Sequence, residues 1–369
     1  MVQGKAGSGK SFLIEKLANE FKSSLGEDSV VILAPTGVAA CNINGKTIHS
    51  FLSIGVDGFS PLQGETLRNF QFKMEKVKVL IFDEMSMIGL TMLAKISQRL
   101  QEGRGSSQEP FGGYIVYFFG DMQQLPPVKN SAWYSEIENP KTAMGKLLSG
   151  TIERYYKLTT CHRQAGDDQR NFRELLDGVA LGNISENMYS LLMSRRVSAL
   201  DAFEVAGFRN AVHIYPTKVL VEKYNEEHLR KTGNPVAKIP ARHNYPQGAN
   251  ATEDQAQGLA NELYLSVGCK VMLRSNLWTE CGLVNGSMGI VRKIRYLEGE
   301  RPTSLPAAIM VEFEKYNGPT YDDGYVPITP LKRSWKIGEN TVTRTQFPLA
   351  VAHAITAHKS QGLTLDKLL

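Results

Sequence analysis

Cysteine is scarce in this sequence. The 369 residues include four scattered cysteines and no Cys-x-x-Cys pair: Cys41, Cys161, Cys269 and Cys281. This usage argues against both a zinc site and a disulfide scaffold, and it is typical of a reducing compartment. We therefore expect an intracellular protein, in the nucleus or mitochondrion of a eukaryote or in the cytoplasm of a bacterium.

Long apolar runs, repeats and a strong net charge are also missing. No apolar run approaches the roughly 20 residues that cross a membrane, and the first residues lack the basic and apolar regions of a secretory signal. The formal net charge of +5 is mild, weaker than that of a histone-like protein and compatible with a groove that follows nucleic-acid phosphates. At 42% hydrophobic residues, the chain is long enough for two domains with cores of their own. We expect no membrane partner.

A glycine-rich motif opens the chain. The residues from Gly4 to Ser11 match G-x-x-x-x-G-K-[ST] at every fixed position. Glycines let main-chain N–H groups surround phosphates, while Lys10 can reach the β- and γ-phosphates and the Ser11 hydroxyl can hold Mg²⁺. Apolar residues recur every four positions over 13–21, which predicts a helix whose N-terminus favours an anion. The motif therefore predicts a nucleotide site formed by Gly4, Gly7, Ser8, Gly9, Lys10 and Ser11.

A pair of acidic residues follows a second apolar segment. Residues 77–82 read as a buried parallel strand that ends in Asp83 and Glu84. In P-loop enzymes the first carboxylate helps to hold Mg²⁺, and the second can polarise the attacking water. Two adjacent acids at a buried strand end are costly without a cation, although a helix N-cap pair is the alternative. The pair favours hydrolysis over phosphoryl transfer to a small molecule.

A third strand, over 114–119, leads into a turn that carries Gln124. Ligands of α/β sheets collect at the carboxyl ends of strands. Gln124 can therefore sense the γ-phosphate and change its contacts after hydrolysis. By itself, a Gly-Asp turn followed by two prolines would indicate only a turn at the end of a strand.

Seven blocks occur in an order that resembles a known family. They are 34–40 (APTGVAA), 47–51 (TIHSF), 83–87 (DEMSM), 120–128 (GDMQQLPPV), 161–164 (CHRQ), 282–287 (GLVNGS) and 357–362 (AHKSQG). Together they resemble the PIF family of superfamily-one DNA helicases, related to the RecD-type enzymes, over nearly the whole chain. The resemblance implies an α/β fold of two RecA-like P-loop NTPase domains, the second interrupted by a small SH3-like β-barrel.

The resemblance also implies domain boundaries. The first RecA-like domain is expected over 1–157, with a small insertion at about 52–74 that works near the strand-separation junction or is an ordinary surface loop. The second domain is expected over 158–264 and 345–369, with the inserted β-rich domain at 265–344. Within the second RecA-like domain, 212–215 reads as a strand, 218–229 as a helix and 348–354 as an apolar helix face.

Further site residues follow from the same blocks. Arg163 is expected to reach the γ-phosphate from the second domain and to stabilise charge during hydrolysis; a structural ion pair is the alternative. For single-stranded DNA, hydroxyls, amides and flat side chains can bind phosphates and stack on bases without reading sequence. The candidates are Thr36, His49, Thr217, His358, Lys359, Ser360 and Gln361, although a lone histidine such as His49 is more often a core residue.

The implied function is an ATP-dependent DNA helicase or translocase that moves 5′-to-3′ in DNA replication, repair, recombination or telomere maintenance. Lys10, Glu84, Gln124 and Arg163 are the expected catalytic residues, and ATP and Mg²⁺ the cofactors, with Ser11 and Asp83 on the metal. The partners are single-stranded DNA and its junctions with duplex, and we expect a monomer. Two alternatives stay open: a RecD-type or relaxase-linked helicase domain, and a P-loop DNA-binding module without unwinding activity.

The family pattern continues beyond both ends of this sequence. A strand that feeds a P-loop normally has about five or more residues, whereas only three precede Gly4. The family also continues after the block at 357–362 with a strand and an arginine that contacts the γ-phosphate, and nothing in this sequence matches it. We therefore expect a fragment truncated at both ends that is poorly stable and nearly inactive in unwinding by itself.

Overall fold

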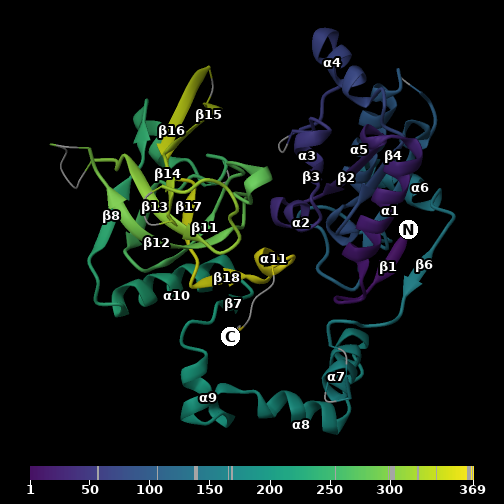
Figure 1. Ribbon diagram of the computed structural model, residues 1–369. Helices are drawn as coiled ribbons and strands as arrows, with labels where there is room; N and C mark the ends of the chain where they lie inside the picture. Colours follow the sequence, from purple (N-terminus) through teal and green to yellow (C-terminus); the bar gives the residue numbers. More distant parts are fainter. Residues whose placement is uncertain are drawn as a thin grey trace. The chain divides into compact units, whose positions relative to one another are not determined.

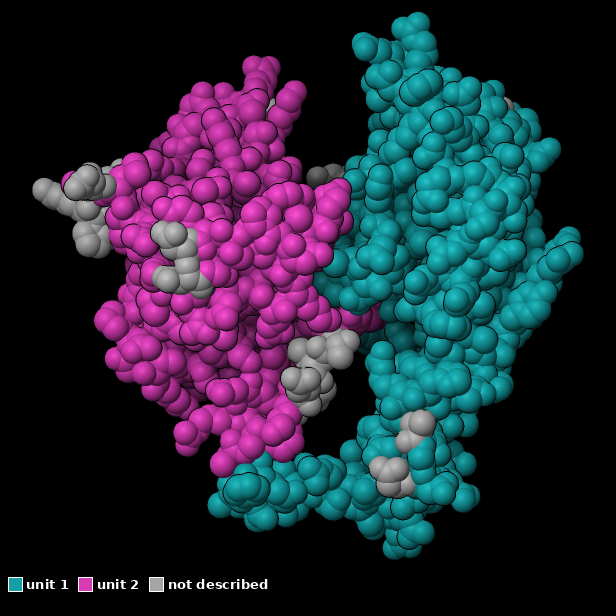
Figure 2. Space-filling view, in the orientation of Figure 1, with its two compact units in different colours: residues 1–205 teal, residues 206–369 magenta. Residues whose placement is uncertain are grey.

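The computed structural model describes residues 1–55, 58–105, 107–136, 140–164, 166–167, 169–253, 255–297, 299, 304–321, 324–337, 339–363, 367 and 369. These residues form two compact units, 1–205 and 206–369, which Figure 2 shows in different colours. Within the described ranges, no helix is both long enough and apolar enough to cross a membrane.

The first unit is built on a parallel sheet. Its strands are β1 (Val2–Gly4), β2 (Val30–Ala34), β3 (Lys46–Thr47), β4 (Val79–Phe82), β5 (Ile115–Gly120) and β6 (Tyr156–Leu158). They lie in the order β3-β2-β4-β5-β1-β6, and every pairing is parallel. This order places β4, β5, β1 and β6, which precede the expected phosphate-binding motifs, next to one another.

Helices cover both faces of this sheet. Residues of α1 (Lys10–Leu25) and α2 (Gly37–Asn42) join the apolar cluster on one face, and residues of α3 (Ile48–Phe51), α4 (Gly64–Met74), α5 (Leu90–Gly103) and α6 (Pro140–Gly150) join the cluster on the other. Helices α7 (Arg170–Leu181) and α8 (Glu186–Ser194) follow β6 and lie beyond the sheet (Figure 1), and α9 (Ala202–Gly207) spans the border of the units. Strand β4 explains the two layers, because its side chains alternate between faces. Val79 and Ile81 join the apolar cluster of α1, whereas Leu80 and Phe82 join that of α5.

The expected insertion at about 52–74 contains one of these helices. The sequence showed little periodicity there, yet the structure has α4 over its second half. Phe70 and Met74 are buried in the same apolar cluster as the residues of α5. They are four positions apart, so they lie on the same face of α4. Residues 56 and 57 lie outside the described residues, and the role of the insertion at a DNA junction stays a prediction.

The second unit combines a small parallel sheet with a larger antiparallel region. Strands β7 (His213–Tyr215) and β18 (Ala354–Thr356) pair in parallel beside α10 (Lys218–Lys231), and α11 (Ala357–Ser360) follows β18. Leu369 adds to the other side of β7, since its N–H donates to Val212 O at 3.1 Å and its carbonyl accepts from Ile214 N at 2.7 Å. The predicted strand at 212–215 and helix at 218–229 are both confirmed.

The antiparallel region extends beyond its expected bounds of 265–344. Its strands are β8 (Val236–Pro240), β9 (Arg242–His243), β10 (Glu262–Ser266), β11 (Lys270–Leu273), β12 (Met288–Arg295), β13 (Ala308–Phe313), β14 (Val326–Ile328), β15 (Leu331–Ile337), β16 (Asn340–Gln346) and β17 (Leu349–Val351). They form an open sheet, β14-β13-β12-β11-β17, together with β15-β16-β9 and β10-β8. The expected SH3-like closure therefore stays a prediction.

One local prediction was wrong. The run over 348–354 was expected to be an apolar helix face, but it contains β17 and leads into β18. Strand β17 pairs with β11, and β18 pairs with β7, partners far away along the chain. A short apolar run cannot be assigned to helix or strand by its periodicity alone.

Residues 158–205 belong to the first compact unit of the structure. The sequence placed these residues in the second RecA-like domain, whereas the structure groups them with the first unit through β6, α7 and α8. Their functional assignment to the second domain stays a prediction.

Candidate nucleotide and nucleic-acid sites

The P-loop joins β1 to α1 and is closed by its own lysine. The ammonium group of Lys10 donates to the carbonyl oxygens of Gly4 at 2.8 Å and of Lys5 at 3.0 Å. Gly7 has φ of 78°, a left-handed conformation that favours glycine. The hydroxyl of Ser8 is buried and has no hydrogen-bond partner within the described part of the chain. The loop therefore contains a hydroxyl group that an anion can satisfy, and the Lys10 ammonium group lies against the carbonyl oxygens of the same loop.

Asp83 ends the fully buried strand β4 and is 6% exposed. Burial, and next the charge of Glu84, raise the pKa of Asp83 to about 6; the main-chain N–H of Glu84 and the Lys10 charge act in the opposite direction. Its Oδ1 has no hydrogen-bond partner among the described residues. A buried carboxylate oxygen of this kind fits a divalent cation, and Ser11 at the start of α1 supplies the hydroxyl that P-loop Mg²⁺ sites use.

Glu84 follows in a left-handed backbone conformation. Its φ is 51° and its ψ is 47°, which is uncommon for a residue other than glycine. The turn after it packs against the end of β5, because a Cβ on Gly120 would lie 2.7 Å from the main-chain nitrogen of Met85. The backbone around Glu84 is therefore held by both β4 and β5.

The end of β5 is linked to the P-loop strand by side chains that the sequence did not single out. Gln3 donates through Nε2 to Oδ1 of Asp121 at 3.1 Å, and its Oε1 accepts from the N–H of Met122 at 3.3 Å. Asp121 is buried, and its Oδ1 also accepts from the N–H of Gln123. Gln124 stands one residue further, with its N–H bound to Asp121 O at 3.0 Å. Topology, not spacing, brings Gln3 and Asp121 together, so no sequence signal could have found this link.

The segment after β6 lies over the P-loop. The N–H of His162 donates to the carbonyl oxygen of Gly7 at 2.7 Å, and a Cβ on Gly7 would be 2.5 Å from Cβ of Arg163. Arg163 is exposed at this place. The first unit alone therefore brings Arg163 to the P-loop, and its contact with a γ-phosphate stays a prediction.

A cavity of about 1010 Å³ adjoins the P-loop on the side of β6 and α7. Gly4, Lys5 and Ala6 line it, together with Thr159, Thr160 and residues of α7. The Lys5 ammonium pairs with Asp177 of α7 at its edge. Both side chains are about half exposed, so this ion pair contributes little to stability.

Two candidate DNA-binding residues follow β2 and β3, the strands at the opposite end of the sheet from β6. Thr36 follows β2 and caps α2, its hydroxyl oxygen accepting from Ala39 N at 3.2 Å. His49 lies in α3 after β3, and since β3 pairs in parallel with β2, both residues stand at the carboxyl edge. Burial, and secondarily the charge of Lys95, lower the pKa of His49. His49 is therefore neutral at pH 7. Its side chain is half-buried, which is compatible both with a core position and with a contact to DNA.

The second unit repeats this arrangement. Thr217 follows β7 and caps α10, and its hydroxyl oxygen accepts from Leu220 N at 3.4 Å. In both units the order is strand, proline, threonine, helix. Because each threonine oxygen accepts from a main-chain N–H, its own hydroxyl proton can still be donated to a phosphate.

The remaining candidates gather near Thr217. His358, Lys359 and Ser360 belong to α11 directly after β18, and Gln361 follows. Since β18 is parallel to β7, their carboxyl ends share one edge of the small sheet. His358 is exposed, whereas Ser360 donates to Ala357 O at 2.8 Å.

The motifs and their geometry agree with known proteins. The model of the family described as PIF1-like helicase matches residues 1–189. The chain belongs to the PIF1-like helicase family. This membership confirms the family resemblance and the α/β, RecA-like fold class.

Individual members of the family match over nearly the whole chain. The ATP-dependent DNA helicase PIF1 of Danio rerio is 31% identical over 374 residues, which cover 98% of this chain and 53% of that protein. The ATP-dependent DNA helicase Pif1 of Bdellovibrio bacteriovorus is 30% identical, covering 99% and 76%. The solved structure of Pif1 helicase from Bacteroides with ADP-AlF3 and single-stranded DNA is 26% identical with a TM-score of 0.67, covering 100% and 81%. The chain thus spans about half the length of the zebrafish relative.

Proposed function

We propose that this chain is the motor part of an ATP-dependent DNA helicase that moves 5′-to-3′ along single-stranded DNA. The observation that carries the proposal is the adjacency of β4, β5, β1 and β6. Their carboxyl ends bring Asp83 and Glu84, Gln124, the P-loop and the segment of Arg163 to one edge of one sheet. Such a cluster is needed for hydrolysis and not for nucleotide binding alone.

The roles of the residues follow from their chemistry. Lys10 leaves the carbonyl oxygens of Gly4 and Lys5 to pair with the β- and γ-phosphates of ATP, and Ser11 and Asp83 hold Mg²⁺. When bound, Mg²⁺ neutralises charge on the phosphates. Glu84 accepts a proton from the attacking water.

Two further residues act on the γ-phosphate. Gln124 contacts it and transmits its loss through the Asp121 turn to Gln3. Arg163 donates to the oxygens that gain charge during hydrolysis. The single-stranded DNA and ADP-AlF3 in the Bacteroides relative support the choice of ligands.

DNA binding is assigned to the two carboxyl edges. Thr36 and His49 in the first unit, and Thr217 with the residues of α11 in the second, offer hydroxyl, amide and ammonium groups to phosphates. Such groups can bind phosphates without reading base edges, which suits a motor that must pass over any sequence. Monomeric action, and a role in repair or recombination, belong to the same proposal.

The deciding experiment measures ATP hydrolysis with and without single-stranded DNA, for the chain and for Lys10→Ala. We expect hydrolysis stimulated by DNA, abolished by Lys10→Ala. Unwinding of duplexes with a 5′ or a 3′ tail tests the direction, and any opening by this chain should be confined to the 5′-tailed duplex. DNA binding without hydrolysis would instead establish the DNA-binding module, and opening of 3′-tailed duplexes would refute the direction.

A further inference from the structure

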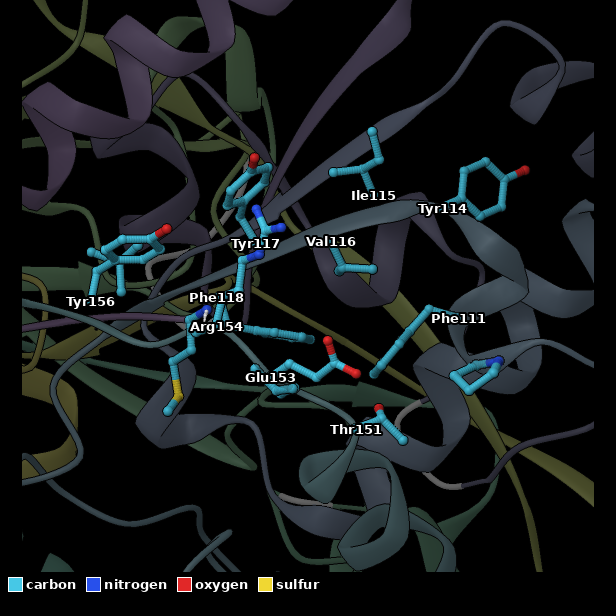
Figure 3. A pocket seen from close by; sticks show the side chains of 14 residues that line it. Phe111, Tyr114, Ile115, Val116, Tyr117, Phe118, Thr151, Glu153, Arg154 and Tyr156 are labelled. Carbon is cyan, nitrogen blue, oxygen red and sulfur yellow. Dashed lines mark hydrogen bonds between the residues drawn. The ribbon is translucent and has the colours of Figure 1, made fainter.

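Two further cavities are lined by residues that the nucleotide and DNA sites do not use. One is in the first unit, where β5, β1 and β6 begin, and its walls include the rings of Phe111 and Phe118 (Figure 3). Its charged side chains, Glu153 and Arg154, have opposite signs, so they select no ligand by charge. The other cavity belongs to the second unit and differs from the first in this respect.

The cavity of the second unit has a volume of about 500 Å³ and is lined by α10, β10 and β17. Each of these elements contributes a leucine, Leu229, Leu263 and Leu349, and all three belong to the buried core of the unit. Asn225 ties α10 to β17, because its Nδ2 donates to Val351 O at 3.1 Å. The cavity therefore opens onto apolar core whose elements are already fixed to one another, which is typical of a preformed binding site.

Acidic side chains outnumber basic ones among the described residues that line this cavity. The acids are Glu222, Glu226, Glu253 and Glu262, and the bases are Arg230 and Arg274. Each arginine is already paired with one of these glutamates, Glu226 or Glu253. The two other glutamates therefore give the cavity an excess of negative charge beside its apolar surface.

These two glutamates come from different elements. Glu222 is an exposed residue of α10 and has no ion-pair partner within the described part of the chain. Glu262 of β10 pairs at 2.8 Å with Lys238, which does not line the cavity; this exposed pair is weak, so another cation can replace it. Tyr264, also on β10, is 43% exposed, and its ring can receive a cation on its face. A ligand suited to the cavity therefore has an apolar group with a cation on each side of it.

We propose that this cavity is a docking site for a short segment of a partner protein in which large apolar side chains are flanked by basic residues. The apolar side chains enter against the three leucines. One basic residue pairs with Glu222, and another binds at Glu262 and Tyr264. An exposed aromatic side chain beside an apolar pocket is typical of protein-binding sites, whereas the phosphates of a nucleic acid would be repelled by the excess negative charge. The proposal does not depend on ATP hydrolysis or on movement along DNA.

The test measures the affinity of the chain for three acetylated and amidated peptides by titration calorimetry. The first is Arg-Leu-Phe-Leu-Arg, the second is Arg-Ser-Ser-Ser-Arg, which keeps only the charges, and the third is Glu-Leu-Phe-Leu-Glu, which keeps only the apolar side chains. The first peptide is also titrated into three variants. Glu222→Lys reverses a charge of the cavity, and Arg230→Gln removes one of its cations. Glu227→Lys is the matched control, because Glu227 is an exposed residue of α10 that does not line the cavity.

The first peptide should bind, and the other two should bind at least about tenfold more weakly. Glu222→Lys should weaken binding of the first peptide by about fivefold, since an attraction is replaced by a repulsion. Arg230→Gln should strengthen it by about twofold, because Glu226 then becomes available to the peptide. Glu227→Lys should leave the affinity unchanged, and high salt should reduce the differences among the variants.

Four outcomes would overturn the proposal. Failure of all three peptides to bind would show that no segment of this chemistry docks. Equal affinity for Arg-Ser-Ser-Ser-Arg would reduce the effect to attraction between charges. Equal losses in Glu222→Lys and Glu227→Lys would place the binding outside the cavity. A dimer in sedimentation that Glu222→Lys dissociates would make a second copy of this chain the occupant. DNA-stimulated ATP hydrolysis should be the same in all three variants and the parent, so a failure of the proposed function is recognised separately.

Discussion

The side chains of Gln3 and Asp121 join the strand before the P-loop to the turn that carries Gln124. Gln3 donates to Asp121 Oδ1 at 3.1 Å and accepts from Met122 N at 3.3 Å, so its side-chain amide is both a donor and an acceptor in this link. Because Gln3 is the residue immediately before Gly4, a single side chain connects the P-loop to the Asp121 turn.

Replacing Gln3 by Met should weaken both stability and catalysis. Buried Asp121 loses one donor and Met122 N–H loses its acceptor, which we expect to cost about 1–3 kcal/mol. Urea unfolding measures the stability, and the rate of hydrolysis at saturating ATP should fall while ATP affinity changes little. Gln101→Met is the matched control, since Gln101 donates to Glu109 O at 3.1 Å in an exposed place. Equal effects of the two substitutions would show that the link has no special role.

Glu84→Gln should separate binding from turnover. The amide keeps the size of the side chain but cannot accept the proton of the attacking water, so turnover should fall by about 10² or more. ATP affinity should be nearly unchanged, because Lys10 and Ser11 are intact. A fluorescent nucleotide measures the affinity and phosphate release the turnover. Near-normal turnover of the variant would remove Glu84 from the role of base.

Buried His353 should make the second unit sensitive to acid. Its Nε2 accepts from Lys270 N at 3.1 Å, its ring stacks on His228 at 3.9 Å, and burial, followed by the charges of His228, Lys270 and His213, lowers its pKa to about 3. Because the folded pKa is below the unfolded value of 6.5, the stabilising contribution of the neutral ring is complete above pH 6.5. It is lost as the pH falls from 6.5 towards 3.

The loss should amount to about 1.4 kcal/mol per pH unit. We expect His353→Gln to be less stable than the parent at pH 7.5 and to lose less stability on acidification to pH 5, as measured by urea unfolding. The exposed His358, replaced by Gln, is the control. Parallel pH profiles of the parent and His353→Gln would contradict the assignment.

Thr217 should have separable roles in capping and in DNA binding. Asp is as good an N-cap as Thr, so Thr217→Asp should keep the stability of the second unit, whereas Thr217→Val should cost about 1 kcal/mol. The carboxylate repels phosphates and has no proton to donate, so Thr217→Asp should still weaken the binding of single-stranded DNA. Thr217→Ser should restore both properties. If Thr217→Asp binds DNA like the parent, this threonine is a helix cap and nothing more.

Lys359 should contribute through charge and not through base recognition. Lys359→Ala should weaken the binding of all single-stranded sequences alike, and should reduce the slope of log affinity against log salt by about one. Lys336→Ala, on exposed strand β15, is the control and should leave the slope unchanged. A loss of affinity confined to one base composition would argue against a phosphate contact.

The sequence predicted the parts of the fold that local patterns determine. The apolar run before Asp83 became β4, the P-loop helix became α1, and 218–229 became α10. It failed where partners are distant: nothing near Leu349 or Ala354 shows that these residues pair with β11 and β7. Helix α4 was missed because its burial depends on Phe70 and Met74 alone within a polar helix.

The site divides in the same way. Lys10, Asp83, Glu84 and Gln124 belong to motifs with fixed spacing, and the sheet order places those motifs together. Gln3 with Asp121, and Lys5 with Asp177, are pairs of ordinary polar residues more than 100 positions apart. Only the fold reveals such pairs, since the motifs that contain Lys5 and Asp121 do not indicate their distant partners.

The left-handed backbone of Glu84 has an evolutionary consequence. At φ of 51°, Gly or Asn would be accommodated more easily than Glu, by on the order of 1 kcal/mol. If Glu84 is the base that we propose, selection for turnover maintains this carboxylate against the local preference of the backbone. In a lineage that keeps DNA binding but abandons hydrolysis, this position should be among the first to drift towards Gly or Asn. Among sequences that share the P-loop, the residue at this position should thus distinguish proteins that hydrolyse ATP from proteins that have lost hydrolysis.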